Sequence, residues 1–174
     1  MINFARIRLV AFDVDGVLTD GHYYVSETGK VKKSFYTRDF YAIEQLLKNE
    51  IYVLIITQSH DLVILSQIHR ICDHSGFWRG CWKKDGIRYE TGINDKYEKL
   101  KEIMQEKKIR IEDVAYMGDA ENDLECMKKV AITACPSDAI DIVKENSNYI
   151  SDYDGGHGCV YDFVMYILKE REKE

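Results

Sequence analysis

Residues 7–21 read IRLVAFDVDGVLTDG, an apolar run followed directly by two aspartates and a glycine. The run Ile7–Phe12 is short and rich in β-branched side chains, which is typical of a strand buried on both faces of a parallel sheet. In an extended chain Asp13 and Asp15 would point to opposite sides, but a turn at Gly16 can bring both carboxylates toward one cavity. This segment therefore predicts a buried strand that delivers two carboxylates to its carboxyl end.

Three further apolar runs have the same strand character, namely Ile51–Ile56, Val114–Met117 and Val130–Ala134. Between the runs, apolar residues recur at helical spacing. These stripes comprise Ile43, Leu46 and Leu47; Leu62, Leu65, Ile68 and Ile71; Tyr97, Leu100, Ile103 and Met104; and Leu124 with Met127. The alternation predicts an α/β fold with a doubly wound, mostly parallel, Rossmann-like sheet.

Polar residues follow these runs at the points where the strands are expected to end. Thr57 follows the second run, and Gly118 and Asp119 follow the third, with Asp123 close behind. Ligands of open α/β sheets bind at the carboxyl ends of strands, and a few carboxylates completed by waters suit Mg²⁺. The alternative is that these aspartates only form turns or cap helices, as Asp119 is placed to do. Two Asp-rich turns at equivalent strand ends favour the metal site.

One segment interrupts the alternation of strands and helices. Residues Tyr23–Phe35 read as a β-hairpin with Gly29 in its turn. The hairpin, about residues 22–36, is expected to project over the strand ends as a small flap. Its apolar side chains would be unfavourable in water and are expected to be buried.

Length and charge restrict the remaining possibilities. The 174 residues predict a single domain over 1–174, and a net charge of −6 disfavours nucleic-acid binding. The sequence offers no apolar stretch long enough to span a membrane and no secretory pattern at its start. Five widely spread cysteines read as reduced thiols in a cytoplasm.

Several motifs together resemble one known family. Residues 13–21 (DVDGVLTDG) resemble the first motif of the haloacid dehalogenase-like phosphohydrolases, and residues 118–123 (GDAEND) resemble the fourth. Thr57 and Lys96 stand at the second and third motifs. Residues 32–39 and 155–158 resemble the substrate loop and the glycine motif of a small branch without a large cap. That branch contains phosphatases of 3-deoxy-D-manno-octulosonate 8-phosphate and of 9-carbon keto acids, and a module of sialate cytidylyltransferases.

The resemblance implies a Mg²⁺-dependent phosphatase acting on a phosphorylated keto-sugar acid. Asp13 would be the nucleophile that forms an aspartyl-phosphate, and Asp15 the general acid and base. Asp13, the backbone carbonyl of Asp15, and Asp119 would bind Mg²⁺, with Asp123 acting through a water or behind the ligands.

The same resemblance implies the residues that bind the substrate. Thr57, the backbone N–H of Gln58, and Lys96 would hold the phosphoryl group. The substrate loop would contribute Thr37, Arg38 and Asp39. Members of this branch close the site with a neighbouring subunit, so a homotetramer is expected as well.

The chain departs from the family pattern mainly where the sugar would bind. Phe40 and Ala42 stand where glycines are usual, and Glu44, Ser59 and Tyr161 stand where arginines are usual. Arginine is the natural partner of a sugar-acid carboxylate, so the phosphate chemistry is expected to be kept while the substrate differs or is less anionic.

Residues 73–92 read as an insertion-like loop that contains both tryptophans, Trp78 and Trp82. Two tryptophans in a loop favour packing over a substrate lid or a subunit contact. Nearby cysteines and histidines fit no strong zinc spacing, so zinc is disfavoured; these residues are His69, Cys72, His74 and Cys81.

The motifs also bear on three alternative functions. A response-regulator receiver also uses an acidic pocket with Thr and Lys, but its paired acids are adjacent, whereas Asp13 and Asp15 are separated by one residue. A phosphatase for another small sugar phosphate or metabolite fits the same motifs. A non-catalytic oligomerisation module, as in the cytidylyltransferases, would have no physical need for Asp13, Asp15, Asp119 and Asp123.

Overall fold

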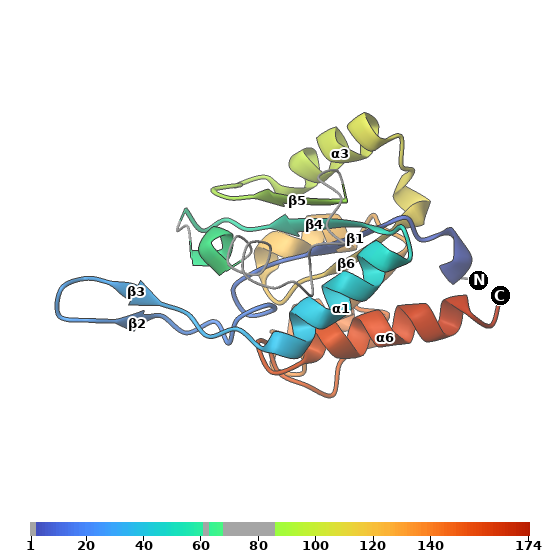
Figure 1. Ribbon diagram of the computed structural model, residues 1–174. Helices are drawn as coiled ribbons and strands as arrows, with labels where there is room; N and C mark the ends of the chain where they lie inside the picture. The colour runs from blue at the N-terminus through green and yellow to red at the C-terminus, as the bar shows by residue number, and fades with distance from the viewer. Residues whose placement is uncertain (1–2, 61–62, 68–85) are drawn as a thin grey trace.

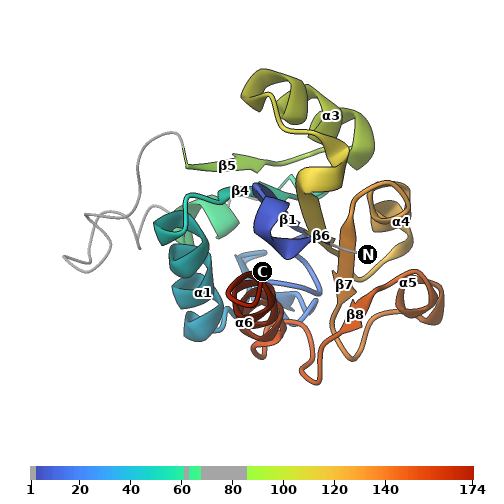
Figure 2. The same cartoon turned by 90° about the vertical axis from the view of Figure 1, so that its right-hand side faces the viewer.

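A computed structural model describes residues 3–60, 63–67 and 86–174 of the chain. Its centre is a six-stranded sheet in the order β5-β4-β1-β6-β7-β8, and each neighbouring pair runs parallel (Figures 1 and 2). The strands are β1 (Leu9–Phe12), β4 (Tyr52–Ile56), β5 (Ile87–Glu90), β6 (Val114–Met117), β7 (Ile132–Cys135) and β8 (Tyr149–Ile150). The predicted α/β class with a parallel sheet is confirmed.

Helices cover both faces of this sheet, as a doubly wound fold requires (Figure 2). On one face lie α1 (Thr37–Lys48) and α6 (Cys159–Arg171). On the other lie α3 (Lys96–Lys107), α4 (Leu124–Met127) and α5 (Asp141–Glu145). Residues 63–67 are also helical. Short 3₁₀ turns are η1 (Phe4–Arg6), η2 (Ile111–Asp113) and η3 (Glu121–Asp123).

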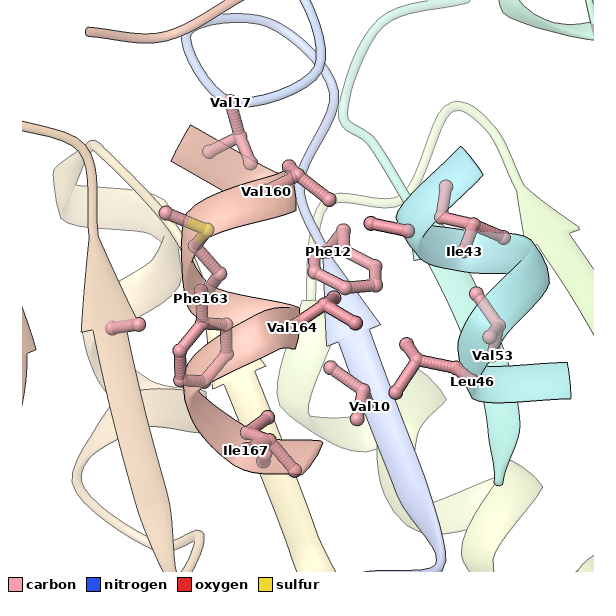
Figure 3. Packing of buried hydrophobic residues seen from close by; sticks show 14 of the residues in the cluster. Val10, Phe12, Val17, Ile43, Leu46, Val53, Val160, Phe163, Val164 and Ile167 are labelled. Carbon is pink, nitrogen blue, oxygen red and sulfur yellow. The ribbon is translucent and has the colours of Figure 1, made fainter. Parts of the chain in front are cut away.

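The central strand β1 is buried on both faces, which explains its unbroken apolar sequence. Val10 and Phe12 point to the face covered by α1 and α6, where Phe12 lies among Leu46 and Val164 (Figure 3). Leu9 and Ala11 belong to the core on the opposite face. Because β1 is held in this way between two layers, the position of Asp13 directly after it is fixed by the core.

The flap is a two-stranded antiparallel hairpin of β2 (Tyr24–Val25) and β3 (Val31–Lys32). Gly29 lies in its turn with a φ of +76°, a conformation that favours glycine. A β-bridge between Thr19 and Phe35 joins the two legs at their base. The hairpin extends away from the carboxyl edge of the sheet (Figure 1).

The structure corrects several predicted boundaries. The first strand begins at Leu9 because Ile7 follows the turn η1, and the last predicted strand is shifted to residues 132–135. The prediction of an insertion-like loop is wrong over residues 87–90, because these residues form the edge strand β5. The cysteines and histidines that disfavour a zinc site by their spacing, and the two tryptophans, lie outside the described residues, at positions 69, 72, 74, 78, 81 and 82. Within the described part of the chain, no helix is long and apolar enough to cross a membrane.

Candidate active site

A cavity of about 310 Å³ opens at the carboxyl edge of the sheet, where β1, β4 and β6 end side by side. Its lining contains the residues that follow those three strands and one residue of the flap. They are Asp13, Asp15, Tyr23, Thr57, Gln58, Ser59, Asp119, Ala120 and Asn122. The sheet register therefore brings together the polar residues that the sequence places after separate strands.

Three carboxylates meet beside this cavity. Asp13, Asp119 and Asp123 each offer an oxygen, and these oxygens all lie within 4.8 Å of one another. Lys96, the first residue of α3, donates to Asp13 Oδ1 at 2.7 Å and to Asp123 Oδ1 at 2.7 Å. One lysine faces three carboxylates, so the cluster can accept further positive charge when the acids are ionised.

The electrostatics of the cluster raise the pKa values of two acids. Burial, and next the negative charge of Asp123, raise the pKa of Asp13 to about 6, although Lys96 opposes the shift. Burial together with Asp13 and Asp123 raises the pKa of Asp119 to about 8. Burial disfavours the charged form of Lys96, but the two carboxylates outweigh it and raise its pKa. In the absence of a cation, protons thus stabilise the cluster.

Asp123 organises the loop after β6. Its Oδ2 accepts hydrogen bonds from the backbone N–H groups of Asp119 at 3.1 Å and Ala120 at 3.2 Å. Its Oδ1 also accepts from the Tyr116 hydroxyl at 2.7 Å. The prediction that Asp119 caps the following helix is therefore wrong, because Asp123 reaches back to satisfy those N–H groups. The carboxylate of Asp119 is left for the cavity, where its buried Oδ1 has no hydrogen-bond partner among the described residues.

Gly16 allows Asp119 to approach the end of β1. Its φ is +90°, and a Cβ at this position would lie 2.1 Å from Asp119 Oδ2. A side chain at residue 16 is therefore excluded twice, by backbone conformation and by contact. The glycine after the paired aspartates serves the site as well as the turn.

Asp15 faces the flap and is held there by three donors. Lys33 Nζ lies 2.7 Å from both of its carboxylate oxygens. The hydroxyls of Tyr23 and Thr19 donate to it at 3.1 Å and 3.2 Å. The sequence assigns no individual role to Lys33 or Tyr23, because a hairpin's pattern does not reveal which of its side chains fold back over its base.

Thr57 and Gln58 lie at the end of β4, opposite the acidic cluster. Thr57 is buried, and its hydroxyl oxygen accepts a hydrogen bond from the backbone N–H of Ser59 at 3.0 Å. Gln58 and Asn122 both line the cavity, and the Gln58 side chain accepts a hydrogen bond from the Asn122 amide at 3.2 Å. Asn122 was not predicted as a site residue, although its place within the fourth motif was a usable signal.

The residues of the predicted substrate loop separate in the structure. Thr37 and Arg38 are exposed at the start of α1. Asp39 is completely buried outside the cavity lining, and its Oδ1 accepts from the backbone N–H of Tyr161 at 2.8 Å. Burial raises the pKa of Asp39 to about 7, against the lowering effect of the N–H groups of Tyr161 and Gly158. Its observed contacts connect α1 to the start of α6.

Of the three positions where the family pattern has arginine, one lines the cavity. This residue is Ser59. Glu44 is buried in α1 and forms an ion pair with Lys48 at 2.8 Å. Tyr161 belongs to the first turn of α6.

Comparisons with known proteins identify relatives of similar sequence and fold. A family model described as haloacid dehalogenase-like hydrolase matches residues 89–163. The 3-deoxy-D-manno-octulosonate 8-phosphate phosphatase of Yersinia pestis is 29% identical over 170 residues, which are 97% of this chain and 83% of that enzyme. A solved structure from Vibrio cholerae, assigned to the same activity, is 30% identical with a TM-score of 0.86 and covers 99% of this chain and 90% of its own.

Two further relatives extend the comparison. The cobalt-bound structure of the Haemophilus influenzae octulosonate 8-phosphate phosphatase is 26% identical with a TM-score of 0.84, covering 98% of this chain and 92% of that one. N-acylneuraminate cytidylyltransferase B of Danio rerio is 28% identical over 169 residues, and the chain spans 38% of that longer protein. The motifs, the fold and the near-complete coverage together show that this chain is a haloacid dehalogenase-like hydrolase and belongs to the 3-deoxy-D-manno-octulosonate 8-phosphate phosphatase family.

Proposed function

We propose that this protein is a Mg²⁺-dependent phosphatase that hydrolyses a phosphorylated sugar through an aspartyl-phosphate on Asp13. The observation that carries the proposal is the convergence of Asp13, Asp119 and Asp123 beside one cavity, where Lys96 binds the first and the last of them. A scaffold would gain nothing from burying three carboxylates together, because each loses its hydration. The cluster therefore argues against the non-catalytic oligomerisation module.

The donor set fits Mg²⁺. Carboxylate oxygens are the ligands that this ion prefers, and Asp119 Oδ1 is a buried acceptor with no partner among the described residues. Asp13, Asp119 and the backbone carbonyl of Asp15 would hold the ion, and Asp123 would act as a ligand or through a water. When bound, Mg²⁺ supplies positive charge to the phosphoryl oxygens and keeps the nucleophile ionised. The cobalt-bound relative supports the binding of a divalent cation.

The protein's own residues carry the two steps of the proposed reaction. Asp13 attacks phosphorus, and the bond from phosphorus to the sugar oxygen breaks as Asp15 donates a proton to that oxygen. Asp15 then takes a proton from water, which attacks phosphorus and releases phosphate from Asp13. Lys96, the Thr57 hydroxyl and the Gln58 backbone N–H hold the developing charge.

The proposed substrate belongs to one of two classes of phosphorylated sugar. The phosphatase relatives favour a keto-sugar acid, namely 3-deoxy-D-manno-octulosonate 8-phosphate or a 9-carbon homologue. A second candidate, a less anionic small sugar phosphate, is favoured by Ser59 in the cavity lining where arginine is usual. The amides of Gln58 and Asn122 in the cavity lining suit sugar hydroxyls.

Assembly and location follow as further parts of the proposal. The flap exposes Tyr24 at 52%, Val25 at 63% and Val31 at 38%, more apolar surface than an isolated hairpin would hold stably in water. We expect a homotetramer in which a neighbouring flap covers these side chains. Free thiols at the described cysteines fit a cytoplasmic enzyme.

Phosphate release from a panel of sugar phosphates, with and without Mg²⁺, tests the proposal. The panel includes 3-deoxy-D-manno-octulosonate 8-phosphate, a 9-carbon keto-acid 9-phosphate and neutral sugar phosphates, with Asp13→Asn as control. Turnover that requires Mg²⁺ and is abolished in Asp13→Asn supports the mechanism, and the preferred substrate decides between the two candidates. A folded protein that releases no phosphate from any of them would contradict the mechanism and favour the scaffold.

A further inference from the structure

The side chain of Lys33 is unlike those of its neighbours on the flap. Val31 is 38% exposed, whereas the Lys33 side chain is 1% exposed although the hairpin projects from the body of the molecule (Figure 1). Its ammonium lies 2.7 Å from both oxygens of Asp15 and 4.6 Å from the centre of the Tyr23 ring. The flap thus buries a cation against one particular carboxylate.

The two aspartates of the first motif are each paired with a different lysine. Lys96 approaches Asp13 at 2.7 Å from α3, which is part of the main body of the domain. Lys33 approaches Asp15 at the same distance from the flap. The orientation of Asp15 is consequently coupled to the position of the flap, while that of Asp13 is set by the main body.

The base of the flap is anchored well enough to fix Lys33 in place. The bridge between Thr19 and Phe35 closes the two legs, and the Phe35 ring packs edge-on against Phe40 of α1 at 5.8 Å between centroids. Thr19 also donates to Asp15 at 3.2 Å. The same short segment therefore holds both Lys33 and the carboxylate that it contacts.

We propose that Lys33, assisted by Tyr23, is a positioning residue that orients Asp15 for proton transfer, and this rests on the proposed phosphatase function. In the first step the bond from phosphorus to the leaving oxygen breaks, and its electron pair goes to that oxygen. Asp15 delivers the proton from one carboxylate oxygen, while the other oxygen keeps its hydrogen bond from Lys33. In the second step the ionised Asp15 accepts a proton from water in the same orientation.

The proposal predicts a dependence on the leaving group. An alkoxide needs a proton in order to leave, whereas p-nitrophenolate departs without one. Lys33→Met is therefore expected to lower kcat/KM for benzyl phosphate about 100-fold, the lower part of the range for general acid catalysis, and for p-nitrophenyl phosphate less than about threefold. Both probes carry one aromatic ring, and kcat/KM reports the steps up to departure of the leaving group.

Further variants separate positioning from a structural role. Lys33→Arg keeps the charge and should restore most of the benzyl phosphate activity, and Tyr23→Phe should show a smaller loss with the same selectivity. Lys30→Met, at an exposed position on the same hairpin, is the matched control and should leave both activities unchanged. Circular dichroism and thermal unfolding establish that each variant is folded.

The outcomes are distinct. A selective loss with benzyl phosphate that Lys33→Arg restores supports the proposal. An equal loss with both probes, a rise in KM alone, or no loss would overturn it while leaving the phosphatase function intact. If the wild-type protein with Mg²⁺ hydrolyses neither probe nor any sugar phosphate, the proposed function fails first and this inference fails with it.

Discussion

The ammonium of Lys96 lies 2.7 Å from an oxygen of Asp123, and their side chains are 1% and 0% exposed. Lys96 is the first residue of α3, where the helix dipole disfavours a cation. Asp95 satisfies the helix start by accepting from the backbone N–H of Glu98 at 2.9 Å. The placement of Lys96 is therefore explained by the acidic cluster rather than by the needs of the helix.

Replacing Lys96 with methionine is expected to destabilise the metal-free protein. The change keeps a similar shape but leaves Asp13 and Asp123 buried without their cation, so the free energy of unfolding near neutral pH should fall by about 3–5 kcal/mol. Added Mg²⁺ should recover part of this loss because it supplies positive charge to the same carboxylates. Urea unfolding with and without Mg²⁺ measures both effects.

Lys101→Met is the matched control for that experiment. Lys101 lies on the same helix, and its side chain is 38% exposed in an ion pair with Glu98. Its loss should change the free energy of unfolding by less than about 1 kcal/mol. If Lys96→Met behaves like Lys101→Met, the acidic cluster does not depend on Lys96 and this interpretation is wrong.

Gly16→Ala and Gly29→Ala should separate backbone strain from damage to the site. Both glycines have positive φ, +90° and +76°, but a Cβ at Gly16 meets Asp119 at 2.1 Å whereas a Cβ at Gly29 meets nothing within 4 Å. Gly29→Ala should cost about 1 kcal/mol and keep the phosphatase activity. Gly16→Ala should also displace Asp119, so that Mg²⁺ no longer raises the melting temperature. Equal Mg²⁺ responses in the two variants would contradict the contact between Gly16 and Asp119.

The sequence predicts the acidic cluster because the ends of buried strands can be recognised from their apolar runs. Asp13, Thr57 and Asp119 each follow an apolar run directly, and parallel pairing brings such positions to one edge. Lys33 could not be placed in this way. It lies 18 positions from Asp15, and only the folded hairpin shows that its side chain turns back to the base.

The strands β5 and β8 could not be predicted from the sequence, and each for a reason that lies in its own residues. β5 reads IRYE, which is too polar to look like a buried strand, and it lies at the edge of the sheet beside β4 only. β8 has two residues, too few for any periodic pattern. Asp39 was predicted to contact substrate, but the packing of α1 against α6, which no local pattern reveals, places it between helices.

Stabilisation by Mg²⁺ is expected to increase with pH. The pKa values of Asp13 and Asp119 are raised from 3.8 to about 6 and about 8, so the metal must displace protons at low pH. For the same reason the metal-free protein should lose stability as pH rises from about 4 to about 8, because the folded state binds more protons than the unfolded state over that range. Thermal unfolding across this range, with and without Mg²⁺, gives both curves.

Asp119→Asn tests the mutual repulsion of the clustered carboxylates by removing one negative charge. Removing one of three clustered carboxylates should leave the metal-free protein at least as stable as the wild type near pH 8. The variant should also lose most of the stabilisation by Mg²⁺. A destabilised variant with a full Mg²⁺ response would show that Asp119 has a structural role and does not bind the ion.

Asp39 should make a separate contribution to the pH dependence of stability, remote from the metal cluster. Burial raises its pKa from 3.8 to about 7, and its Oδ2 has no hydrogen-bond partner among the described residues. A raised folded-state pKa stabilises the protein fully at pH values below the pKa of the unfolded state, and this stabilisation is lost as pH rises toward about 7.

Asp39→Asn removes this titration, while Oδ1 of the asparagine can still accept the hydrogen bond from the backbone N–H of Tyr161. The free energy of unfolding of the variant relative to wild type should therefore increase by up to about 4 kcal/mol between about pH 4 and about pH 8. Urea unfolding at both pH values measures the change, with Asp152→Asn at an exposed position as the control. A constant difference across that range would show that the Asp39 carboxylate is ionised and stable between the two helices.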